Sequence, residues 1–337
     1  MDWSRGYTAS YYVSIVDPAT WRDLETIEIT GGSINRDYED GLRESASFDC
    51  DDYSPGIEQW IRIYLYTQQE GSDDDHIALF TGLATSPSIE YNGVLESRNI
   101  ECYSVLKPAN DIYLLRGWYA PRGSTGGEVI RDLLSVIPAP VIIEDGSPIL
   151  SSNIIADDEE TRLSMVHKVL LAMSGWRMRI GGDGTVYIEK IPDRPTEFFD
   201  PLYNPVIETD IKITEDLFNC PNIFIAIEDE ITAIARDYSE GNLSVPNRGR
   251  EVMVQESGCQ LMDNETIEEY ADRRLKELQQ HNISASYNRR FIPDLYPGDP
   301  VRLSYPEQGL DDIFYVETQS IELSYAARTS ETVIARG

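Results

Sequence analysis

The sequence has 337 residues, of which 41% are hydrophobic, so it is long and apolar enough to form a folded protein with more than one core. It carries 59 acidic residues against 28 Lys and Arg, a formal net charge of −31. A surface this acidic repels nucleic acid and anionic membranes at long range, which argues against a protein whose function is to bind either of them.

The cysteine spacing and the N-terminus narrow the class further. Cys50, Cys102, Cys220 and Cys259 form no CxxC pair, so we expect buried, reduced thiols instead of a zinc site or a disulfide framework. The N-terminal "MDWSRGYTAS" lacks the basic and apolar segments of a signal peptide. No stretch approaches the roughly 20 apolar residues of a membrane span, so we expect a protein made and folded in a cytoplasm.

Residues 1–109 have the pattern of short antiparallel strands. Runs rich in Tyr, Ile, Val and Thr alternate with polar residues and are separated by polar turns, as in "YTASYYVSIVD" and "QWIRIYLYTQQ". Several such strands at close spacing predict a first β-barrel domain, 1–109.

Residues 110–198 predict a small α/β domain between two β domains. The segment 124–138, "STGGEVIRDLLSVIP", has Thr125 and Glu128 at capping-box spacing and an apolar helical stripe. The segment 157–175 begins with acidic residues, has helical periodicity and ends at Gly175, the natural C-terminal glycine. The alternating "WRMRIGGDGTVYIEK" that follows predicts a β-hairpin.

The remaining sequence returns to strands and contains one further helix. We predict a second β-barrel domain from residues 199–258 and 284–337, with an inserted helical segment at 259–283. The helix has one apolar stripe, formed by Ile267, Tyr270, Ala271, Leu275 and Leu278. The expected fold class is therefore mainly β with an α+β insertion: two antiparallel β-barrels, a small α/β domain between them and a helix inserted in the second barrel.

The segment "NRRFIPDLYPGDPVRLSY", residues 288–305, contains the clearest turn signal in the chain. Pro297 and Gly298 suit the central positions of a type II turn, where the second residue needs a positive φ. Asp299 could be a working group of a ligand-binding loop, or the turn could be a corner of the barrel. Its place before an alternating strand favours the corner.

A search for catalytic patterns gives no constellation. The histidines His76, His167 and His281 have no motif-level partner. The acidic runs 71–76 and 156–160 lack the spacing of a calcium loop, and the glycine-rich 123–128 lacks the lysine of a phosphate loop. We expect no enzyme, no catalytic residue, no bound metal and no cofactor.

Four long segments, taken in order, resemble the tail hub (baseplate hub) proteins of tailed bacteriophages. The first of these segments resembles the end of the first barrel and the start of the insertion in the hub proteins, and the second resembles the helix and hairpin of the insertion. The third resembles the start of the second barrel, and the fourth resembles the helix and closing strands of that barrel. The segments are "HIALFTGLATSPSIEYNGVLESRNIECYSVLKPANDIYLLRGWYAPRGSTGGEVIRDLL", "SMVHKVLLAMSGWRMRIGGDGTVYIEK", "NCPNIFIAIEDEITAIARD" and "EEYADRRLKELQQHNISASYNRRFIPDLYPGDPVRLSY".

This resemblance implies a structural role in the virion. Such hubs form homotrimeric rings whose two similar barrels per subunit join the six-fold tail tube or distal tail protein to three-fold tip, spike or fibre proteins. The ring encloses a channel for the tape-measure protein and for the genome, which passes without specific binding. The chain ends soon after the last predicted strand, so we expect any wall-degrading enzyme on another polypeptide.

Two further expectations concern charge. We expect Asp and Glu to dominate the channel wall, where they repel DNA phosphates, and Arg289 and Arg290 to lie at a subunit interface. Two alternatives stay open: a carbohydrate-binding or glycan-cleaving β-rich module, suggested by the tyrosines and tryptophans, and a distal tail or other baseplate barrel protein, which would form hexamers.

Overall fold

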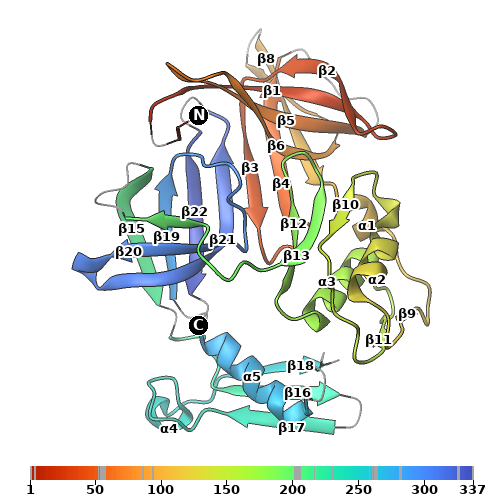
Figure 1. Cartoon of the computed structure of the whole chain (residues 1–337), viewed down its shortest axis with the longest axis vertical. Coiled ribbons are helices and arrows are strands. Elements are labelled where there is room, and N and C mark those ends of the chain that lie inside the picture. Colours follow the sequence, from red (N-terminus) through yellow and green to blue (C-terminus); the bar gives the residue numbers. More distant parts are fainter. Residues whose placement is uncertain are drawn as a thin grey trace.

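The chain is mainly β in the computed structural model, with five α-helices among the residues described, as the sequence predicts (Figure 1). Most strands belong to one large, mainly antiparallel sheet. None of the helices described is long and apolar enough to cross a membrane. The structure describes residues 2–3, 5–51, 53, 58–85, 87–92, 95–200, 206–215, 217–228, 231–257, 259, 261, 265–280, 283–324 and 327–335.

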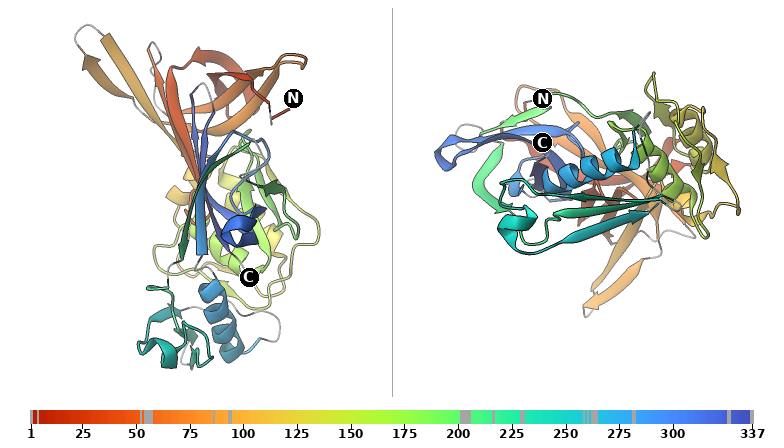
Figure 2. Two further views of the ribbon diagram at one scale, coloured as in Figure 1. Left: turned by 90° about the vertical axis from the view of Figure 1, so that its left-hand side faces the viewer. Right: turned by 90° about the horizontal axis from the view of Figure 1, so that it is seen from below.

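The first β unit contains eight strands; the fourth, for example, alternates buried and less buried residues as the sequence pattern requires, whereas the second is exposed along nearly its whole length. Its core is built from Phe48, Ile61, Phe80 and Ile100, each fully buried. The hairpin β7–β8 projects from the body (Figure 2, left). The strands are β1 (Thr8–Asp17), β2 (Arg22–Glu28), β3 (Gly31–Asp37), β4 (Glu44–Cys50), β5 (Gln59–Gln68), β6 (Asp75–Ala84), β7 (Ser88–Asn92) and β8 (Leu95–Ser104).

The α/β insertion packs three helices beside a three-stranded sheet ordered β10-β13-β12. The predicted capping box of the second helix is wrong, because the Thr125 side chain makes no capping hydrogen bond; Thr161 and Ser164 cap the third helix instead. The elements are α1 (Lys107–Asp111), β9 (Tyr119–Ala120), α2 (Gly126–Leu133), η1 (Leu134–Val136), β10 (Val141–Ile143), β11 (Ile154–Ile155), α3 (Arg162–Ala172), β12 (Trp176–Ile180) and β13 (Val186–Lys190).

The core of the second β unit contains Phe199, Val301, Leu303, Phe314 and Val333, all fully buried. Its strands pair antiparallel except for β14, which runs parallel to β20. The elements are β14 (Glu197–Phe199), β15 (Ile207–Glu215), β19 (Ile283–Arg289), β20 (Pro300–Tyr305), η2 (Pro306–Gln308), β21 (Leu310–Glu322) and β22 (Thr329–Ala335).

The inserted helix is part of a separate small body. It packs on a separate three-stranded sheet ordered β17-β16-β18, whose strands we expected in the second barrel (Figures 1 and 2). The sheet separates because alternate residues of β16 and β17, among them Phe224 and Ala233, are buried against the stripe of the helix. We call this body the α5 unit: β16 (Ile223–Glu228), β17 (Ile231–Arg236), α4 (Val245–Arg248), β18 (Met253–Ser257) and α5 (Ile267–Gln280).

The two β units share one sheet. Strand β3 of the first pairs antiparallel with β21 of the second over Ser33–Asp37 and Thr318–Glu322, and we call this junction the seam. The resulting order is β15-β19-β22-β21-β3-β4-β8-β6-β5-β1-β2, with β7, β14 and β20 attached beside it. Within the described residues no pairing closes either group of strands into a barrel.

Candidate functional site

A row of polar side chains lies buried across the seam. Glu44, Arg36, Gln319, Glu331 and Tyr287 are successive cross-strand partners on β4, β3, β21, β22 and β19. Each is at most 5% exposed. The Gln319 Nε2 atom donates to Glu331 Oε1 at 2.7 Å, and the Tyr287 hydroxyl donates to Glu331 Oε2 at 2.7 Å. Across the seam, Arg36 Nη1 donates to Gln319 Oε1 at 3.4 Å, so the row ties both β units together inside the sheet.

Arg289 completes this row instead of facing another subunit. Its guanidinium binds Glu331 through two hydrogen bonds, Nε to Oε2 at 3.0 Å and Nη2 to Oε1 at 2.8 Å, and both side chains are at most 1% exposed. Arg289 thus has no exposed group with which to reach a neighbouring chain. Its parity with the inward-facing Ala285 and Tyr287 on β19 is the sequence signal for this burial. Arg290, the next residue, is exposed.

The two carboxylates of the row differ in their pKa. Burial raises the pKa of Glu331, but Arg289 and the hydrogen bonds from Gln319 and Tyr287 outweigh burial, so the pKa lies below its usual value. Burial raises the pKa of Glu44 to about 8, because Arg36 Nε lies 3.8 Å from its carboxylate and compensates only in part. Glu331 is therefore held as an anion, whereas burial favours the protonated form of Glu44 up to about pH 8.

The turn at Pro297–Gly298 is a corner, as predicted, and it also holds the insertion. The Asp299 N–H donates to the Tyr296 carbonyl at 3.0 Å, and Gly298 has a φ of 88°, as a type II turn requires. The Asp299 carboxylate, 4% exposed, lies 2.7 Å from Arg177 Nη2 on β12 of the insertion. Burial raises the pKa of Asp299 more than Arg177 lowers it.

Tyr296 occupies the centre of the junction between the three bodies. The guanidinium of Arg36, from the first β unit, lies over its ring at 4.6 Å. The guanidinium of Arg179, from the insertion, lies over the same ring at 5.0 Å. An aromatic face that contacts two cations is a favourable arrangement, because the ring quadrupole attracts both. The sequence patterns gave no indication of this contact.

His167 joins the insertion to the first β unit. Its Nε2 atom lies 3.0 Å from the Gly41 carbonyl, and its Nδ1 atom lies 3.4 Å from Arg43 Nη2. Burial and the neighbouring Arg43 lower the pKa of His167 to about 4. The imidazole is therefore neutral at physiological pH and has a structural role.

The other sequence candidates for chemistry have local roles. In the run 71–76, Asp74 accepts a hydrogen bond from the Tyr66 hydroxyl at 2.6 Å, and in the run 156–160, Glu160 binds Lys168 at 2.9 Å. The glycine-rich 123–128 forms the entry of α2. Across the described part of the chain no three His, Cys, Asp or Glu side chains are placed to hold a metal, and His281 lies outside it. The four cysteines are free and buried.

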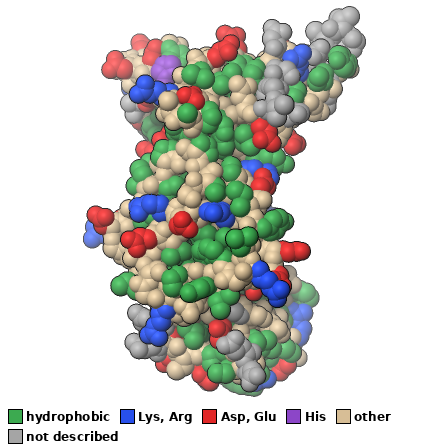
Figure 3. Space-filling model, turned by 90° about the vertical axis from the view of Figure 1, so that its right-hand side faces the viewer, with side chains coloured by type: hydrophobic (Ala, Val, Ile, Leu, Met, Phe, Trp, Pro, Cys, Tyr) green, Lys and Arg blue, Asp and Glu red, His purple; other side chains and the backbone are tan. Residues whose placement is uncertain are grey.

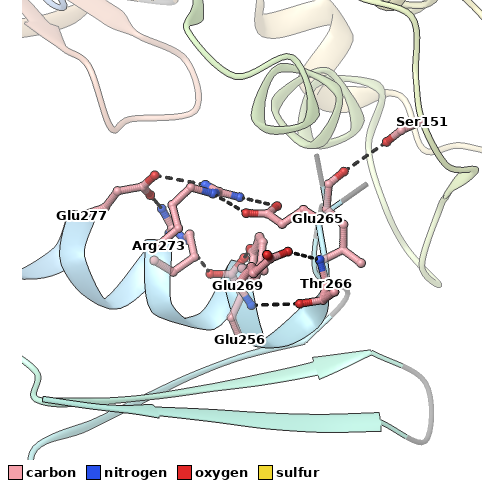
Figure 4. Close-up of polar contacts among 10 residues, drawn as sticks. Ser151, Glu256, Glu265, Thr266, Glu269, Arg273 and Glu277 are labelled. Carbon is pink, nitrogen blue, oxygen red and sulfur yellow. Dashed lines mark hydrogen bonds and ion pairs between the residues drawn. The ribbon is translucent and has the colours of Figure 1, made fainter. Parts of the chain in front are cut away.

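The α5 unit is organised by charged pairs along its helix (Figure 4). Arg273 contacts Glu265 at 2.7 Å and Glu277 at 3.0 Å, while the backbone N–H of Thr266 donates to Glu269 at 2.9 Å at the start of the helix. One hydrogen bond reaches the insertion, from Ser151 Oγ to the Leu261 carbonyl at 3.1 Å. The ion pairs stabilise the α5 unit internally, and the bond from Ser151 shows that the residue Leu261 faces the insertion.

Two surfaces are large enough to meet other macromolecules. The first is a groove of about 990 Å³ over β15, β19, β22, β21 and β3. Its floor carries hydroxyl and amide side chains in cross-strand pairs, for example Ser320 with Asn35 at 2.8 Å and Ser330 with Asn288 at 2.7 Å. This face is mostly neutral and contains few carboxylates, such as Asp37 and Asp210.

The second surface is apolar and lies on the insertion. We call it the insertion patch: Tyr113, Leu115, Tyr119, Ile149 and Ile155. Leu115 is 84% exposed, and Tyr119 and Ile155 are exposed cross-strand partners on β9 and β11. Figure 3 shows hydrophobic side chains spread over this side of the molecule. Five large exposed apolar side chains on one small domain, two of them adjacent, make this surface a candidate contact between chains.

No family model and no curated protein matches the sequence. Solved structures do match it over nearly the whole length. A tail protein from Neisseria meningitidis MC58 is 14% identical with a TM-score of 0.71, and the match covers 96% of each chain. The 43 kDa tail protein of prophage MuSo2 from Shewanella oneidensis is 10% identical with a TM-score of 0.69, over 98% of each chain.

A more distant match extends the comparison beyond phages. The Escherichia coli c3393 protein, a component of the type VI secretion system, is 9% identical with a TM-score of 0.53, over 96% of this chain and 77% of its own. The chain therefore has the fold of phage tail proteins. The resemblance seen in the sequence is confirmed at the level of the fold.

Proposed function

We propose that this chain is a structural, non-catalytic hub protein of the tail tip or baseplate of a tailed phage or a phage-derived injection machine. In this proposal three copies form a ring between the six-fold tail tube or distal tail protein and the three-fold tip, spike or fibre proteins. The ring is assembled in the host cytoplasm and becomes part of the virion. The tape-measure protein and the genome pass through its channel.

The insertion patch is the observation that carries the assembly. Burying a side chain such as Leu115 or Ile155 stabilises a contact by about 1.5–3 kcal/mol, so five such residues support a stable interface with a second copy. The seam supports the same role, because a sheet shared by both β units makes a rigid segment of a ring wall.

The groove suggests what the channel wall is made of. Its lining is mainly hydroxyl and amide side chains, and of its two cationic residues, Lys212 and Arg36, the second is buried, so it presents little cationic surface to a nucleic acid. A wall of this kind lets a polyanion pass without tight contacts. We therefore revise the expectation of a carboxylate-dominated channel: neutral polar groups predominate on the face we assign to it, and the acidic residues lie mainly elsewhere.

Native mass spectrometry of the purified chain at micromolar concentration tests the proposal. We expect a trimer, either of the chain alone or after the neighbouring tail proteins are added. The Leu115→Asp variant should dissociate to monomers. The matched control is Leu24→Asp on β2, also exposed but remote from the insertion patch, which leaves the trimer intact. A monomer that persists with tail partners present contradicts the proposal, and a hexamer identifies a distal tail protein instead.

A further inference from the structure

Aromatic rings from three strands form a platform on the outer face of the first β unit. Tyr12 on β1 and Tyr64 on β5 are cross-strand partners, with ring centroids 4.9 Å apart and planes 13° apart. Tyr66 on β5 pairs with His76 on β6, with centroids at 4.7 Å. We call these four residues the tyrosine platform. Tyr12, Tyr64 and Tyr66 are half-buried and His76 is exposed, so part of the ring surface is open to a ligand.

Hydrogen bonds fix the orientation of these rings. The hydroxyl of Tyr64 donates to Asp23 at 2.6 Å, that of Tyr66 donates to Asp74 at 2.6 Å, and that of Tyr12 lies 3.0 Å from His76 Nδ1. A tyrosine has few rotatable bonds, and one whose hydroxyl is also held loses little entropy when a ligand covers it. The platform is therefore preorganised for binding.

A groove of about 720 Å³ runs beside the platform and is lined by Tyr12, Tyr66 and His76. Its other wall includes Ser10, Thr26 and Glu28. The side chains of these three residues make no hydrogen bond within the described part of the chain, so their hydroxyl and carboxylate groups are available to a ligand. Aromatic surface with a few available polar groups is the usual composition of a small-ligand site.

We propose that the tyrosine platform and its groove bind a neutral oligosaccharide. A sugar ring has an apolar C–H face that packs on an aromatic face. The hydroxyls at the rim of the sugar donate hydrogen bonds to carboxylate and hydroxyl oxygens such as those of Glu28 and Thr26. The surrounding Asp23, Glu28 and Asp74 repel anionic ligands, which favours an uncharged sugar chain.

The composition of the groove argues against a permanent subunit contact at this place. The cores of obligate interfaces are apolar and depleted in charged residues, whereas this groove has a carboxylate and free hydroxyls between its rings. The binding proposed here goes beyond assembly and does not depend on the ring, because all of its residues lie in one β unit of one chain. It would give the tail a direct contact with polysaccharide of the host surface.

Saturation-transfer NMR on the intact chain tests this inference, with chitotetraose and maltotetraose as neutral probes and a heparin tetrasaccharide as anionic probe. We expect transfer to at least one neutral probe at millimolar concentration and none to heparin. Tyr66→Ala should lower the transfer at least five-fold, and Glu28→Gln should lower it less. Tyr238→Ala, which removes an exposed tyrosine that lies after β17 in the α5 unit, should leave it unchanged.

The test does not depend on a single variant being able to fold. Glu28 is exposed, so Glu28→Gln folds even if Tyr66→Ala does not, and circular dichroism checks both. Absence of transfer to both neutral probes, or equal transfer in wild type and Tyr66→Ala, overturns the inference. Protection of Tyr12 and Tyr66 from hydroxyl-radical footprinting in the assembled oligomer, without any sugar, identifies a subunit contact instead and also overturns it.

Discussion

Asp299 and Arg177 form an ion pair, 2.7 Å apart, that joins the corner of the second β unit to the insertion. Both side chains are at most 5% exposed. Burial of the Asp299 carboxylate raises its pKa more than Arg177 lowers it, so the pair is not a strong source of stability by itself. The pair matters for its position: Arg177 also binds Glu189 at 2.7 Å, whereas Arg177 is the ion-pair partner of the buried Asp299 carboxylate across the junction between the two bodies.

Breaking this pair should destabilise the protein. Asp299→Asn keeps an acceptor for the Tyr296 N–H but leaves Arg177 with less compensation, so we expect a loss of about 3 kcal/mol in the free energy of unfolding. Urea denaturation measures it. The double variant Arg177→Met/Asp299→Asn should recover part of the loss, whereas additive losses would show that the pair is not coupled. Asp311→Asn, which breaks the exposed pair with Arg302, is the control and should change little.

The buried Glu44 should make the free energy of unfolding fall as the pH rises. Its folded-state pKa of about 8 lies above its ordinary value of 4.5, so the folded state retains a proton that the unfolded state has lost between these values. Its contribution to the free energy of unfolding is therefore full below about pH 4.5 and falls as the pH rises to about 8. Glu44→Gln should abolish this fall, so its stability relative to wild type should rise over that interval.

Urea unfolding of wild type and Glu44→Gln at about pH 5 and about pH 9 measures this difference. Glu25→Gln, on the exposed strand β2, is the control and should show the same pH dependence as wild type. If the difference between Glu44→Gln and wild type is the same at both pH values, Glu44 keeps its ordinary pKa in the folded protein.

His167 should act in the opposite direction, on the acidic side. Its folded-state pKa of about 4 lies below the ordinary 6.5, so the neutral ring stabilises the fold fully above about pH 6.5, and this contribution is lost as the pH falls through 4. His167→Gln should remove this component from a comparison of melting temperatures at about pH 7 and about pH 5. In an NMR titration, the His167 ring signals should not move near pH 6.5, whereas a midpoint there would contradict the assignment.

Gly298 should not accept a side chain. Its φ of 88° is strained for other residues, and a Cβ atom there would lie 2.6 Å from Tyr38 Cε2. Gly298→Ala should therefore cost more than the ~1–2 kcal/mol that backbone strain alone brings. Gly309→Ala is the matched control, because Gly309 has a φ of 72° and nothing within 4 Å of the added Cβ. Equal losses in the two variants would show that the Tyr38 contact yields without cost.

Sequence patterns predicted the elements better than their partners. The stripe of Ile267, Tyr270 and Leu275 located α5, and Pro297–Gly298 located the corner, because both features depend on neighbours in sequence. The seam could not be predicted this way. Alternation in β3 shows that one face is buried, but it does not identify β21, far along the chain, as the strand beside it.

The buried polar residues were the hardest to predict. Arg289 was assigned to a subunit interface because arginine suits interfacial ion pairs and the sequence is rich in carboxylates, although its parity with Ala285 and Tyr287 points inward. Its burial depends on Glu331, and that pairing is known only once β19 and β22 are adjacent. The short strands of the α5 unit were likewise assigned to the wrong sheet, since strand patterns do not specify which sheet a strand joins.

The seam also constrains how the chain is made. Asn35 and its hydrogen-bonded neighbour Ser320 are 285 residues apart, so β3 has no partner on that edge until almost the whole polypeptide has left the ribosome. Until then the open edge of β3 can pair with strands of other nascent chains, and contacts of such long range form slowly. Synthesis of the last strands, β21 and β22, therefore completes the first domain as well as the second, and a chain truncated before them lacks a finished sheet in either half.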